Sequence, residues 1–249
     1  MPPRRTVERN MHNYYVGFDR DGTLELPGLP VPEQLRRQLH RFQDAGARLF
    51  IASGKSYDVL RPICAEIGLR PWMYACENGG HIVFPATGNE YVREADADLK
   101  RFVAAVDTLD LPPFQEEAKR SIWSKKFGAE SLHAKAIIDD FVTQRGLNLD
   151  VFAYPDGDGG LDVVPRGIDK VNLLRFLPPD AVIHYFGDGD NDLGIMRAAH
   201  VQPHTVANAK PVVKACVAAR GGHVSALRAG YGVAEGLALL AGERLDTAA

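Results

Sequence analysis

Two aspartates separated by one residue, Asp19 and Asp21, have the types and the spacing best suited to chemistry in this chain. The residues before them, 14–18, are apolar or small and predict a buried strand of a parallel sheet. Gly22 lets the backbone turn after the pair, and in open α/β sheets ligands bind beyond the carboxyl ends of the strands. Two crowded carboxylates repel each other, and a Mg²⁺ ion would relieve that repulsion. The same string also occurs in turns and calcium loops, so the pair alone leaves its role open.

Four more polar residues stand at comparable places, and each suits one part of a phosphoryl transfer. They are Ser53, Lys170, Asp188 and Asp192. A carboxylate can attack phosphorus to form an aspartyl-phosphate, and a second carboxylate can give and take the proton. A hydroxyl at a helix N-terminus can cradle a phosphate together with nearby backbone N–H groups, and a lysine can neutralise its charge. These residue types together predict phosphoryl-transfer chemistry.

The elements that would position these residues alternate between strand and helix. Apolar runs predict strands at 14–18, 48–52, 72–76, 181–186 and 201–206. Apolar stripes and terminal Pro or Gly residues predict helices at 32–45, 57–67 and 168–176, and from about residues 210 and 233. This alternation favours an α/β fold with a doubly wound parallel sheet.

The pattern changes between residues 82 and 165. Alternating runs and turns predict a hairpin at 81–84 and 90–93, strands at 121–127, 149–154 and 161–164, and helices at 96–109 and 130–145. This is the pattern of a small α+β unit inserted into the α/β core. We therefore expect a core of residues 1–84 and 166–249, with a frayed tail over 1–12, and a cap of residues 85–165.

The composition excludes several classes of protein. The 249 residues carry a net charge of −3 and are 45% hydrophobic, as in an ordinary globular protein. That charge gives no electrostatic footprint for nucleic acid or for an anionic membrane. The sequence shows no signal peptide and no long apolar span, and its three distant cysteines suit free thiols, so we expect a cytoplasmic protein.

The chain resembles the haloacid dehalogenase (HAD) superfamily of phosphatases in the order of four motifs. They are Asp-Arg-Asp-Gly-Thr (19–23), Ser-Gly-Lys (53–55), Lys170 and Gly-Asp-Gly-Asp-Asn-Asp (187–192). The insert follows Glu77-Asn78-Gly79-Gly80, a position that resembles the subgroup with a large α/β cap (type IIB, Cof-like and sucrose-phosphatase-like). The resemblance covers nearly the whole chain. It implies a Rossmann-like parallel-sheet core with an inserted α+β cap domain.

The resemblance also implies roles for the acidic residues. Asp19 would be the nucleophile and a Mg²⁺ ligand. Asp21 would be the general acid and base, and its backbone carbonyl would bind the metal. Asp188 would be the other carboxylate ligand of the metal, and Asp192 would hold metal-bound waters or Lys170.

The remaining site residues would bind phosphate or support the others. The phosphate-binding set implied by the resemblance is Ser53, Gly54 and Lys170, and the supporting set is Asn78, Asn191 and Asn208. One departure is Lys55, which stands where the family often has arginine.

The expected activity is Mg²⁺-dependent hydrolysis of a small phosphorylated metabolite, with a sugar phosphate as the substrate class. A phosphomutase is the alternative, and it would need a second anion site in the cap; a non-enzymatic regulator that binds metal or phosphate is a third possibility. Residues 121–127 alternate as a strand, so neighbouring side chains lie on opposite faces. We expect Lys125 or Lys126 to contact a sugar-like leaving group, with a solvated lysine pair as an equally open alternative.

Overall fold

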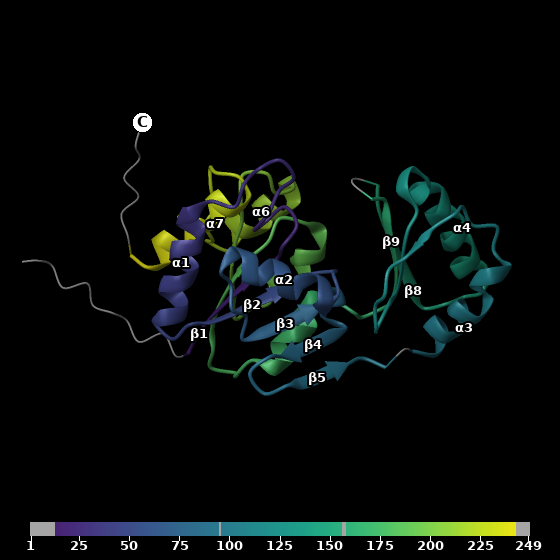
Figure 1. Cartoon of the computed structure of the whole chain (residues 1–249), viewed down its shortest axis with the longest axis horizontal. Helices are drawn as coiled ribbons and strands as arrows, with labels where there is room; N and C mark the ends of the chain where they lie inside the picture. Colours follow the sequence, from purple (N-terminus) through teal and green to yellow (C-terminus); the bar gives the residue numbers. More distant parts are fainter. Residues whose placement is uncertain (1–12, 95, 156–157, 243–249) are drawn as a thin grey trace, which may run out of the picture.

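The computed structural model describes residues 13–94, 96–155 and 158–242, so the tail expected at 1–12 lies outside the described residues. Two sheets lie side by side in it (Figure 1). The larger has seven strands in the order β11-β10-β1-β2-β3-β4-β5, and the smaller has four in the order β6-β7-β9-β8. Both the parallel core sheet and the separate cap sheet that the sequence predicts are therefore present.

The larger sheet forms the core. Its strands are β1 (Tyr14–Phe18), β2 (Arg48–Ala52), β3 (Met73–Cys76), β4 (His81–Phe84), β5 (Asn89–Val92), β10 (Val182–Phe186) and β11 (Val201–His204). Five of them pair in parallel, and the β4–β5 hairpin adds two antiparallel strands. The helices around it are α1 (Glu33–Asp44), α2 (Tyr57–Ile67), α5 (Leu193–Arg197), α6 (Pro211–Ala219) and α7 (Ala229–Leu240). The segments that connect the strands contain three short 3₁₀ helices. They are η1 (Glu77–Gly79) after β3, η4 (Lys170–Phe176) before β10 and η5 (Asp190–Asp192) after β10.

The smaller sheet forms the cap. Its antiparallel strands are β6 (Gln115–Glu116), β7 (Trp123–Lys126), β8 (Leu149–Tyr154) and β9 (Gly160–Pro165). The cap helices are α3 (Ala97–Ala105) and α4 (Ser131–Gln144), with short 3₁₀ turns η2 (Val106–Thr108) and η3 (Gly128–Glu130). Both α-helices cover the face of the sheet that is turned away from the core (Figure 1). The apolar side chains of that face, Trp123, Val151, Leu161 and Val163 among them, pack with α3 and α4 into a second hydrophobic cluster.

One boundary differs from the prediction. Residues 90–93 were expected in the cap, but β5 pairs with β4 at the edge of the core sheet. In a short hairpin, the second strand pairs with the first through backbone hydrogen bonds. Because β4 already pairs with β3, the hairpin adds β5 to the core sheet. The core sheet therefore reaches Val92 and not residue 84. That the two parts fold as separate domains stays a prediction.

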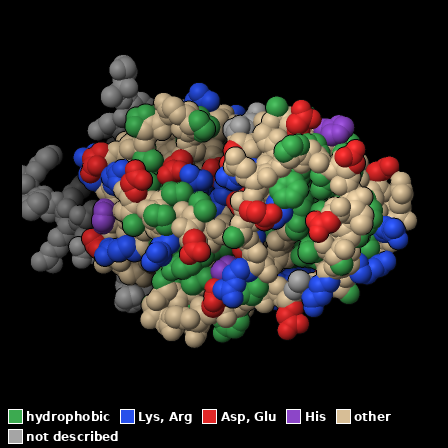
Figure 2. Space-filling model, turned by 45° about the vertical axis from the view of Figure 1, so that its right-hand side comes forward, with side chains coloured by type: hydrophobic (Ala, Val, Ile, Leu, Met, Phe, Trp, Pro, Cys, Tyr) green, Lys and Arg blue, Asp and Glu red, His purple; other side chains and the backbone are tan. Residues whose placement is uncertain are grey.

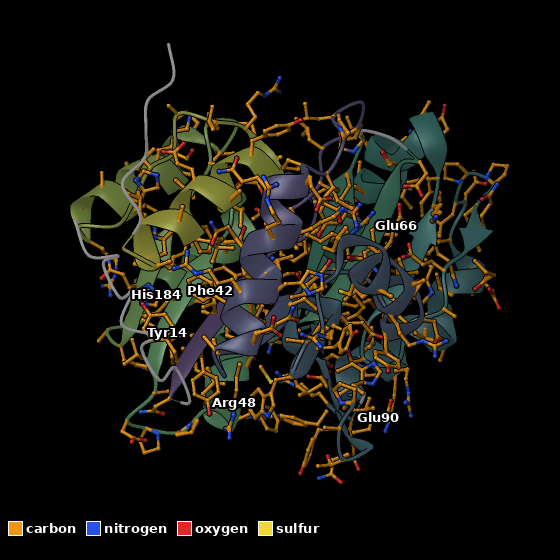
Figure 3. The ribbon with its side chains drawn as sticks, turned by 60° about the vertical axis from the view of Figure 1, so that its left-hand side comes forward. Tyr14, Phe42, Arg48, Glu66, Glu90 and His184 are labelled. Carbon is orange, nitrogen blue, oxygen red and sulfur yellow. The ribbon has the colours of Figure 1, made fainter. Side chains whose placement is uncertain are left out.

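The end of the core sheet away from the strands' carboxyl termini carries structural contacts. Tyr14 stacks on His184 with ring centroids 4.7 Å apart, and Arg48 bonds to Tyr15 Oη at 2.5 Å (Figure 3). His184 bonds to His204 at 2.9 Å, and burial lowers the pKa of His184 to about 4. The imidazole is therefore neutral near pH 7, and its contacts with Tyr14 and His204 are structural.

Gly17 lies at the centre of β1, where two aromatic rings approach the backbone. Its register partners are Phe50 on β2 and Tyr185 on β10, whose rings stack with centroids 6.3 Å apart. A Cβ on Gly17 would overlap the Phe50 ring and would lie 2.8 Å from Tyr185. Because Tyr185 also donates to Asp192, this glycine fixes the position of a site residue.

Replacing Gly17 by Ala should lower the free energy of unfolding by about 1–3 kcal/mol, because the rings must move in a close-packed core. Denaturant unfolding of the metal-free protein measures this. Gly160→Ala is the control, since a Cβ there would meet only the Tyr154 ring, at 3.7 Å. Equal stabilities for the two variants would contradict the packing at Gly17.

Candidate active site

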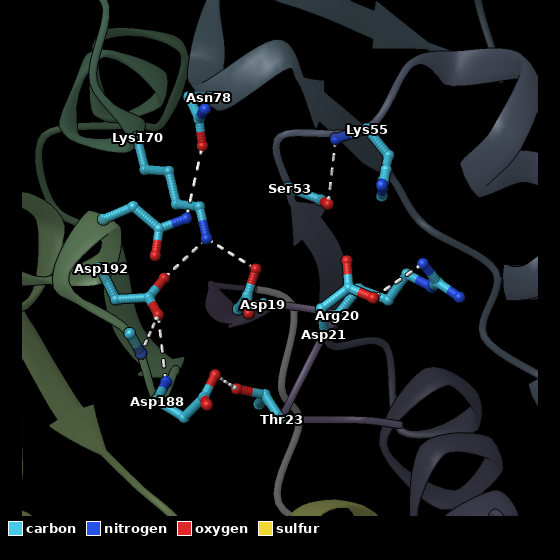
Figure 4. Close-up of polar contacts among 12 residues, drawn as sticks. Asp19, Arg20, Asp21, Thr23, Ser53, Lys55, Asn78, Lys170, Asp188 and Asp192 are labelled. Carbon is cyan, nitrogen blue, oxygen red and sulfur yellow. Dashed lines mark hydrogen bonds and ion pairs between the residues drawn. The ribbon is translucent and has the colours of Figure 1, made fainter. Parts of the chain in front are cut away.

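The polar residues singled out in the sequence meet at the carboxyl-terminal edge of the core sheet (Figure 4). Asp19 follows β1, Ser53 follows β2, and Asp188 follows β10. Lys170 enters from η4, whose first turn is capped by Asp169: its side chain accepts from the Val171 N–H at 2.8 Å. Parallel strands thus bring together residues that lie up to 170 positions apart.

Lys170 is the centre of this cluster. Its side chain is completely buried, and its Nζ lies 2.6 Å from Asp19 Oδ1 and 2.7 Å from Asp192 Oδ1. Burial alone would lower the pKa of Lys170, but the charges of Asp19 and Asp192 outweigh it and raise the pKa above its ordinary value. The Lys170 ammonium is therefore charged near pH 7.

Asp192 is held entirely by the protein. Its Oδ1 accepts from Lys170 and from the Tyr185 hydroxyl at 2.7 Å, and its Oδ2 accepts from the backbone N–H groups of Asp188 and Gly189, both at 3.0 Å. A carboxylate with four hydrogen bonds has little acceptor capacity left. Asp192 therefore serves to position Lys170 and the backbone of the loop after β10.

Asp19 and Asp188 have a different environment. Each bonds through one oxygen to a neighbouring side chain: Asp19 to Lys170, and Asp188 Oδ1 to the Thr23 hydroxyl at 3.0 Å. Burial, followed by the charge of Asp192, raises the pKa of Asp188 to about 6. Burial and the neighbouring carboxylates likewise raise the pKa of Asp19, although Lys170 opposes them. The negative charges of Asp19 and Asp188 therefore lie close to other carboxylates and are only partly compensated by Lys170.

The charge balance of the site indicates a cation. One oxygen from each of Asp19, Asp188 and Asp192 lies within 4.8 Å of the others, while Lys170 supplies a single positive charge. Three carboxylates and one ammonium leave two negative charges uncompensated in a buried place, which a divalent ion with oxygen ligands would match. Because four hydrogen bonds already occupy the Asp192 carboxylate, Asp19 and Asp188 are the side chains whose oxygens can bind such an ion.

The loop after β2 forms a second wall of the site. Ser53 is buried, and its Oγ accepts from the Lys55 N–H at 3.2 Å. The Ser53 carbonyl accepts from the Asn78 N–H at 2.9 Å, so the turn after β3 fixes the loop. Asn78 has a left-handed backbone, with φ of 54°, and its side-chain oxygen accepts from Asn191 at 3.4 Å. Gly54 lies close to the same Asn78 side chain.

Asn208 supports the loop that follows Asp19. Its side-chain nitrogen donates to the Gly22 carbonyl at 2.7 Å, and its side-chain oxygen accepts from the Ala229 N–H at 2.8 Å. Gly22 has φ of 81°, and a Cβ there would collide with Asp188. Only glycine fits this close approach of the two acidic loops.

Asp21 lies apart from the buried cluster. Its carboxylate side chain is 59% exposed and pairs with Arg20 at 2.9 Å, while Arg20 also pairs with Glu25 at 2.8 Å. Asp21 therefore stands at the mouth of the site, two positions after Asp19 in sequence, with its side chain in solvent (Figure 4).

The two cap lysines lie on opposite faces of β7, as the alternation predicts. Lys125 shares the helix-covered face with Trp123: its Nζ lies 5.2 Å from the Trp123 ring centroid, and it pairs with Glu116. Lys126 lies on the other face and pairs with Asp158 at 2.5 Å. Only Lys126 of the two is turned to the side where the core lies.

Sequence reasoning gave no role to three residues that the structure brings to the site. Thr23 bonds to Asp188, and its place inside the first motif was the available signal. Tyr185 bonds to Asp192, but on an apolar strand it looks like any core residue. Glu77 is fully buried, and its carboxylate accepts from the backbone of Arg120 and from the backbone and side chain of Ser121, just before β7 of the cap. Its place in the Glu77-Asn78-Gly79-Gly80 stretch marked the position of the insert, but not this contact.

No helix in residues 13–94, 96–155 and 158–242 has the length and apolar character needed to cross a membrane.

Comparison with known proteins agrees with this site. Residues 16–144 match the family of haloacid dehalogenase-like hydrolases. A phosphomannomutase of Galdieria sulphuraria is 30% identical over 136 residues, which cover 51% of this chain and 53% of that protein. The 5-amino-6-(5-phospho-D-ribitylamino)uracil phosphatase YbjI of Escherichia coli (strain K12) is 25% identical over 225 residues, covering 74% of this chain and 82% of that protein. Several of the curated relatives are matched over about half of their length or less.

Solved structures share the whole architecture. The sucrose-phosphatase of Synechocystis sp. PCC6803 has a TM-score of 0.68 at 18% identity, covering 92% of this chain and 98% of that one. A haloacid dehalogenase-like hydrolase from Bacteroides thetaiotaomicron has a TM-score of 0.69 at 20% identity, with coverage of 91% and 99%. At these identities the likeness establishes the fold. The family match spans half of the sequence and includes the first two motifs, so it confirms the family that the sequence predicts. The chain belongs to the haloacid dehalogenase-like hydrolases and carries an inserted cap sheet.

Proposed function

We propose that this protein is a Mg²⁺-dependent phosphatase that hydrolyses a small phosphomonoester, with a sugar phosphate as the substrate class, through an aspartyl-phosphate on Asp19. The observation that carries the proposal is the position of the buried Lys170 ammonium, 2.6 Å from Asp19 and at the same sheet edge as Ser53 and Asp188. A cation beside a crowded carboxylate favours attack of that carboxylate on an anionic group, because the charge that builds up is already compensated.

In the first step, an Asp19 oxygen forms a bond to phosphorus while the bond from phosphorus to the leaving oxygen breaks. Asp21, exposed at the mouth, gives its proton to the leaving oxygen. In the second step, Asp21 takes a proton from water, which attacks the same phosphorus and releases inorganic phosphate and free Asp19. The Ser53 hydroxyl, the Gly54 N–H and Lys170 hold the phosphoryl oxygens throughout. Asn78, Asn191 and Asn208 support the loops that carry these groups.

The residues present fit a magnesium ion. Asp19 and Asp188 supply the carboxylate oxygens that are not saturated by the protein, and the Asp21 carbonyl would complete the protein ligands. When bound, Mg²⁺ would reduce the repulsion between the attacking carboxylate and the anionic phosphoryl group.

The relatives support the substrate class in part. They include the phosphatase YbjI and several phosphomannomutases, so a phosphomutase is the second candidate. A mutase must hold a bisphosphate and therefore needs a free cationic site in the cap. A regulator without activity is disfavoured, because Asp19 and Asp21 are both present. We propose the cap, from about residue 93 to 165, as the part that selects the leaving group, since the core residues contact only phosphate and metal.

The direct test of the proposed function is Asp19→Asn. The change removes the attacking charge at nearly constant shape, so phosphate release from para-nitrophenyl phosphate and from sugar phosphates with Mg²⁺ should fall by about 10³-fold or more. Circular dichroism and unfolding midpoints serve as controls for folding. Near-normal turnover by a folded Asp19→Asn protein would mean that another group is the nucleophile.

The raised pKa of Asp188 predicts how pH and metal affect stability. The ordinary pKa is 3.8 and the folded one about 6, so the folded state holds the proton more tightly. In metal-free protein, this stabilising contribution is present below pH 4 and is lost as pH rises through 6. In the Asp188→Asn variant the side chain at this position stays uncharged at every pH, so this loss of stability with rising pH is absent. At pH 7.5 without metal it should exceed the parent protein in free energy of unfolding by roughly 1–2 kcal/mol, and at pH 4 the difference should shrink.

Addition of Mg²⁺ at pH 7.5 should stabilise the parent protein and leave Asp188→Asn nearly unchanged, because the variant lacks a ligand. Denaturant unfolding with chelator and with Mg²⁺ measures both effects, and the activity assay under the same conditions should require Mg²⁺. A parent protein with the same stability in chelator and in Mg²⁺, or full turnover in chelator, would contradict the metal assignment.

A further inference from the structure

A second group of charged side chains joins the core to the cap, outside the cluster around Lys170. His81 on β4 is 2% exposed and lies between Glu77 of η1 and Glu90 of β5, which Figure 3 labels. The His81 Nε2 atom lies 2.6 Å from Glu90 Oε1, and its Nδ1 atom lies 3.7 Å from Glu77 Oε1. Arg120 of the cap pairs with the same Glu90 oxygen. Figure 2 shows Lys and Arg side chains beside Asp and Glu side chains where the two parts of the molecule meet.

Both ring nitrogens of His81 face a carboxylate. A neutral imidazole has one N–H and one lone pair, so in either tautomer the lone pair would be turned to a carboxylate. Only the doubly protonated ring suits both sides. The Nδ1 atom is buried and has no hydrogen-bond partner among the residues that the structure describes, so the charge of Glu77 is what favours a proton there.

The charges of the cluster balance only while the His81 ring carries both protons. Glu77 and Glu90 are then matched by Arg120 and the imidazolium. Burial alone would lower the pKa of His81, but the two carboxylates outweigh it and raise the pKa above 6.5. The other titratable side chain at the ring, Cys76 in register on β3, is uncharged, because burial raises the pKa of its thiol. Loss of the His81 proton would leave the buried Glu77 carboxylate without a cation.

Glu77 links this charge balance to the cap. Its carboxylate accepts from the Arg120 N–H at 2.9 Å and from the Ser121 N–H and hydroxyl, both at 2.6 Å. Burial would raise the pKa of Glu77, but the donors around it, His81 among them, outweigh burial and lower it. The contact is close, since a Cβ on Gly80 would lie 2.2 Å from the Ser121 hydroxyl. Glu77 therefore binds the cap as a carboxylate, and His81 is the cation beside it.

The turn that carries Glu77 also contacts two loops of the candidate active site. Glu77 and Asn78 have left-handed backbone, a conformation that persists only where surrounding contacts determine it. The Asn78 N–H donates to the Ser53 carbonyl, and a Cβ on Gly79 would lie 2.8 Å from the Asp169 carbonyl, just before η4. A change in the contacts of Glu77 therefore reaches both the loop after β2 and the start of η4.

We propose that His81 is a positioning residue of the active site, and that its proton controls how firmly the cap segment at Arg120 and Ser121 is held. With both protons, the ring compensates Glu77, and the segment stays bound to the turn after β3. When the ring is neutral, the Glu77 carboxylate faces a lone pair, the segment is released, and the turn relaxes together with the loop after β2. The segment is therefore held in acid and released as pH rises. The effect on turnover rests on the proposed phosphatase function, whereas the release of the segment does not.

Hydrogen–deuterium exchange of the Arg120 and Ser121 amides tests the release directly, because both N–H groups donate to Glu77. Exchange in metal-free protein at pH 6 and pH 8.5 would be expressed relative to helix α7 in the same sample, which removes the intrinsic effect of pH. In the parent protein, the protection of the two amides should fall by about fivefold or more between these pH values. In His81→Gln, which carries no charge, protection should already be low at pH 6 and change by less than about twofold.

His133→Gln, at an exposed histidine of α4, is the matched control and should behave as the parent protein does. An equal change in all three proteins, or a constant protection in the parent protein, would overturn the proposal.

Glu90→Gln gives a second test that does not depend on folding of the His81 variant, because the Glu90 side chain is 38% exposed. The change removes the carboxylate beside Nε2, so the ring should lose its proton at lower pH. Over a pH series, the midpoint of the change in protection should move down by about 0.5 pH unit or more. Glu116→Gln, at an exposed carboxylate that pairs with Lys125, should leave the midpoint unchanged. An unchanged or higher midpoint in Glu90→Gln would overturn the role of His81.

Turnover supplies the functional readout. The ratio of kcat/KM for para-nitrophenyl phosphate with Mg²⁺ in the parent protein to that in His81→Gln cancels the titration of every group that the two proteins share. This ratio should be about threefold or more at pH 6 and approach one at pH 8.5. A ratio that does not change with pH would mean that His81 has a structural role alone. Absence of hydrolysis by the parent protein would refute the proposed function, and the exchange experiment would still decide the role of His81.

Discussion

The structure depends on burying one ammonium among three carboxylates. Among the residues that the structure describes, Lys170 alone donates to the carboxylates of both Asp19 and Asp192, and its side chain has no solvent access. Such a cluster is costly unless every group has a partner, and the partners come from distant parts of the chain. Asp192 is fixed by Tyr185 and by two backbone N–H groups, and Gly17 leaves the room in which the Tyr185 ring lies. The residual negative charge of these carboxylates would suit a divalent cation.

A second constraint links the loop after β2 to the cap. The turn after β3 holds two residues in a left-handed conformation, Glu77 with φ of 53° and Asn78 with φ of 54°. Strained backbone of this kind persists only where its surroundings determine it. Here the Asn78 N–H fixes the Ser53 carbonyl, while the Glu77 carboxylate binds the peptide at Ser121. The turn after β3 therefore fixes both the loop after β2 and the cap segment at Ser121.

The sequence predicts most elements of the core and of the cap, but not how the cap elements pack or which sheet each hairpin extends. Apolar runs followed by polar residues predict the parallel strands, and since such strands end at one edge, the meeting of Asp19, Ser53 and Asp188 follows. Strand alternation places Lys125 and Lys126 on opposite faces, but which face the helices cover depends on tertiary packing. The same limit applies to β5, since a hairpin pattern does not say which sheet the hairpin extends. The Glu77 carboxylate accepts hydrogen bonds from Arg120 and Ser121, more than 40 positions away, and no local pattern predicts such contacts.

We propose that Asp19 carries the phosphoryl group between the two steps. Asp21→Asn should slow hydrolysis of the aspartyl-phosphate, because water activation is lost. Peptide mass spectrometry of that variant, quenched in acid during turnover of para-nitrophenyl phosphate with Mg²⁺, observes the intermediate directly. The account predicts a phosphoryl adduct on the Asp19 side chain, absent when Asp19 is also replaced by Asn. A phosphoryl adduct on any other residue, or continued turnover by the double variant, would contradict it.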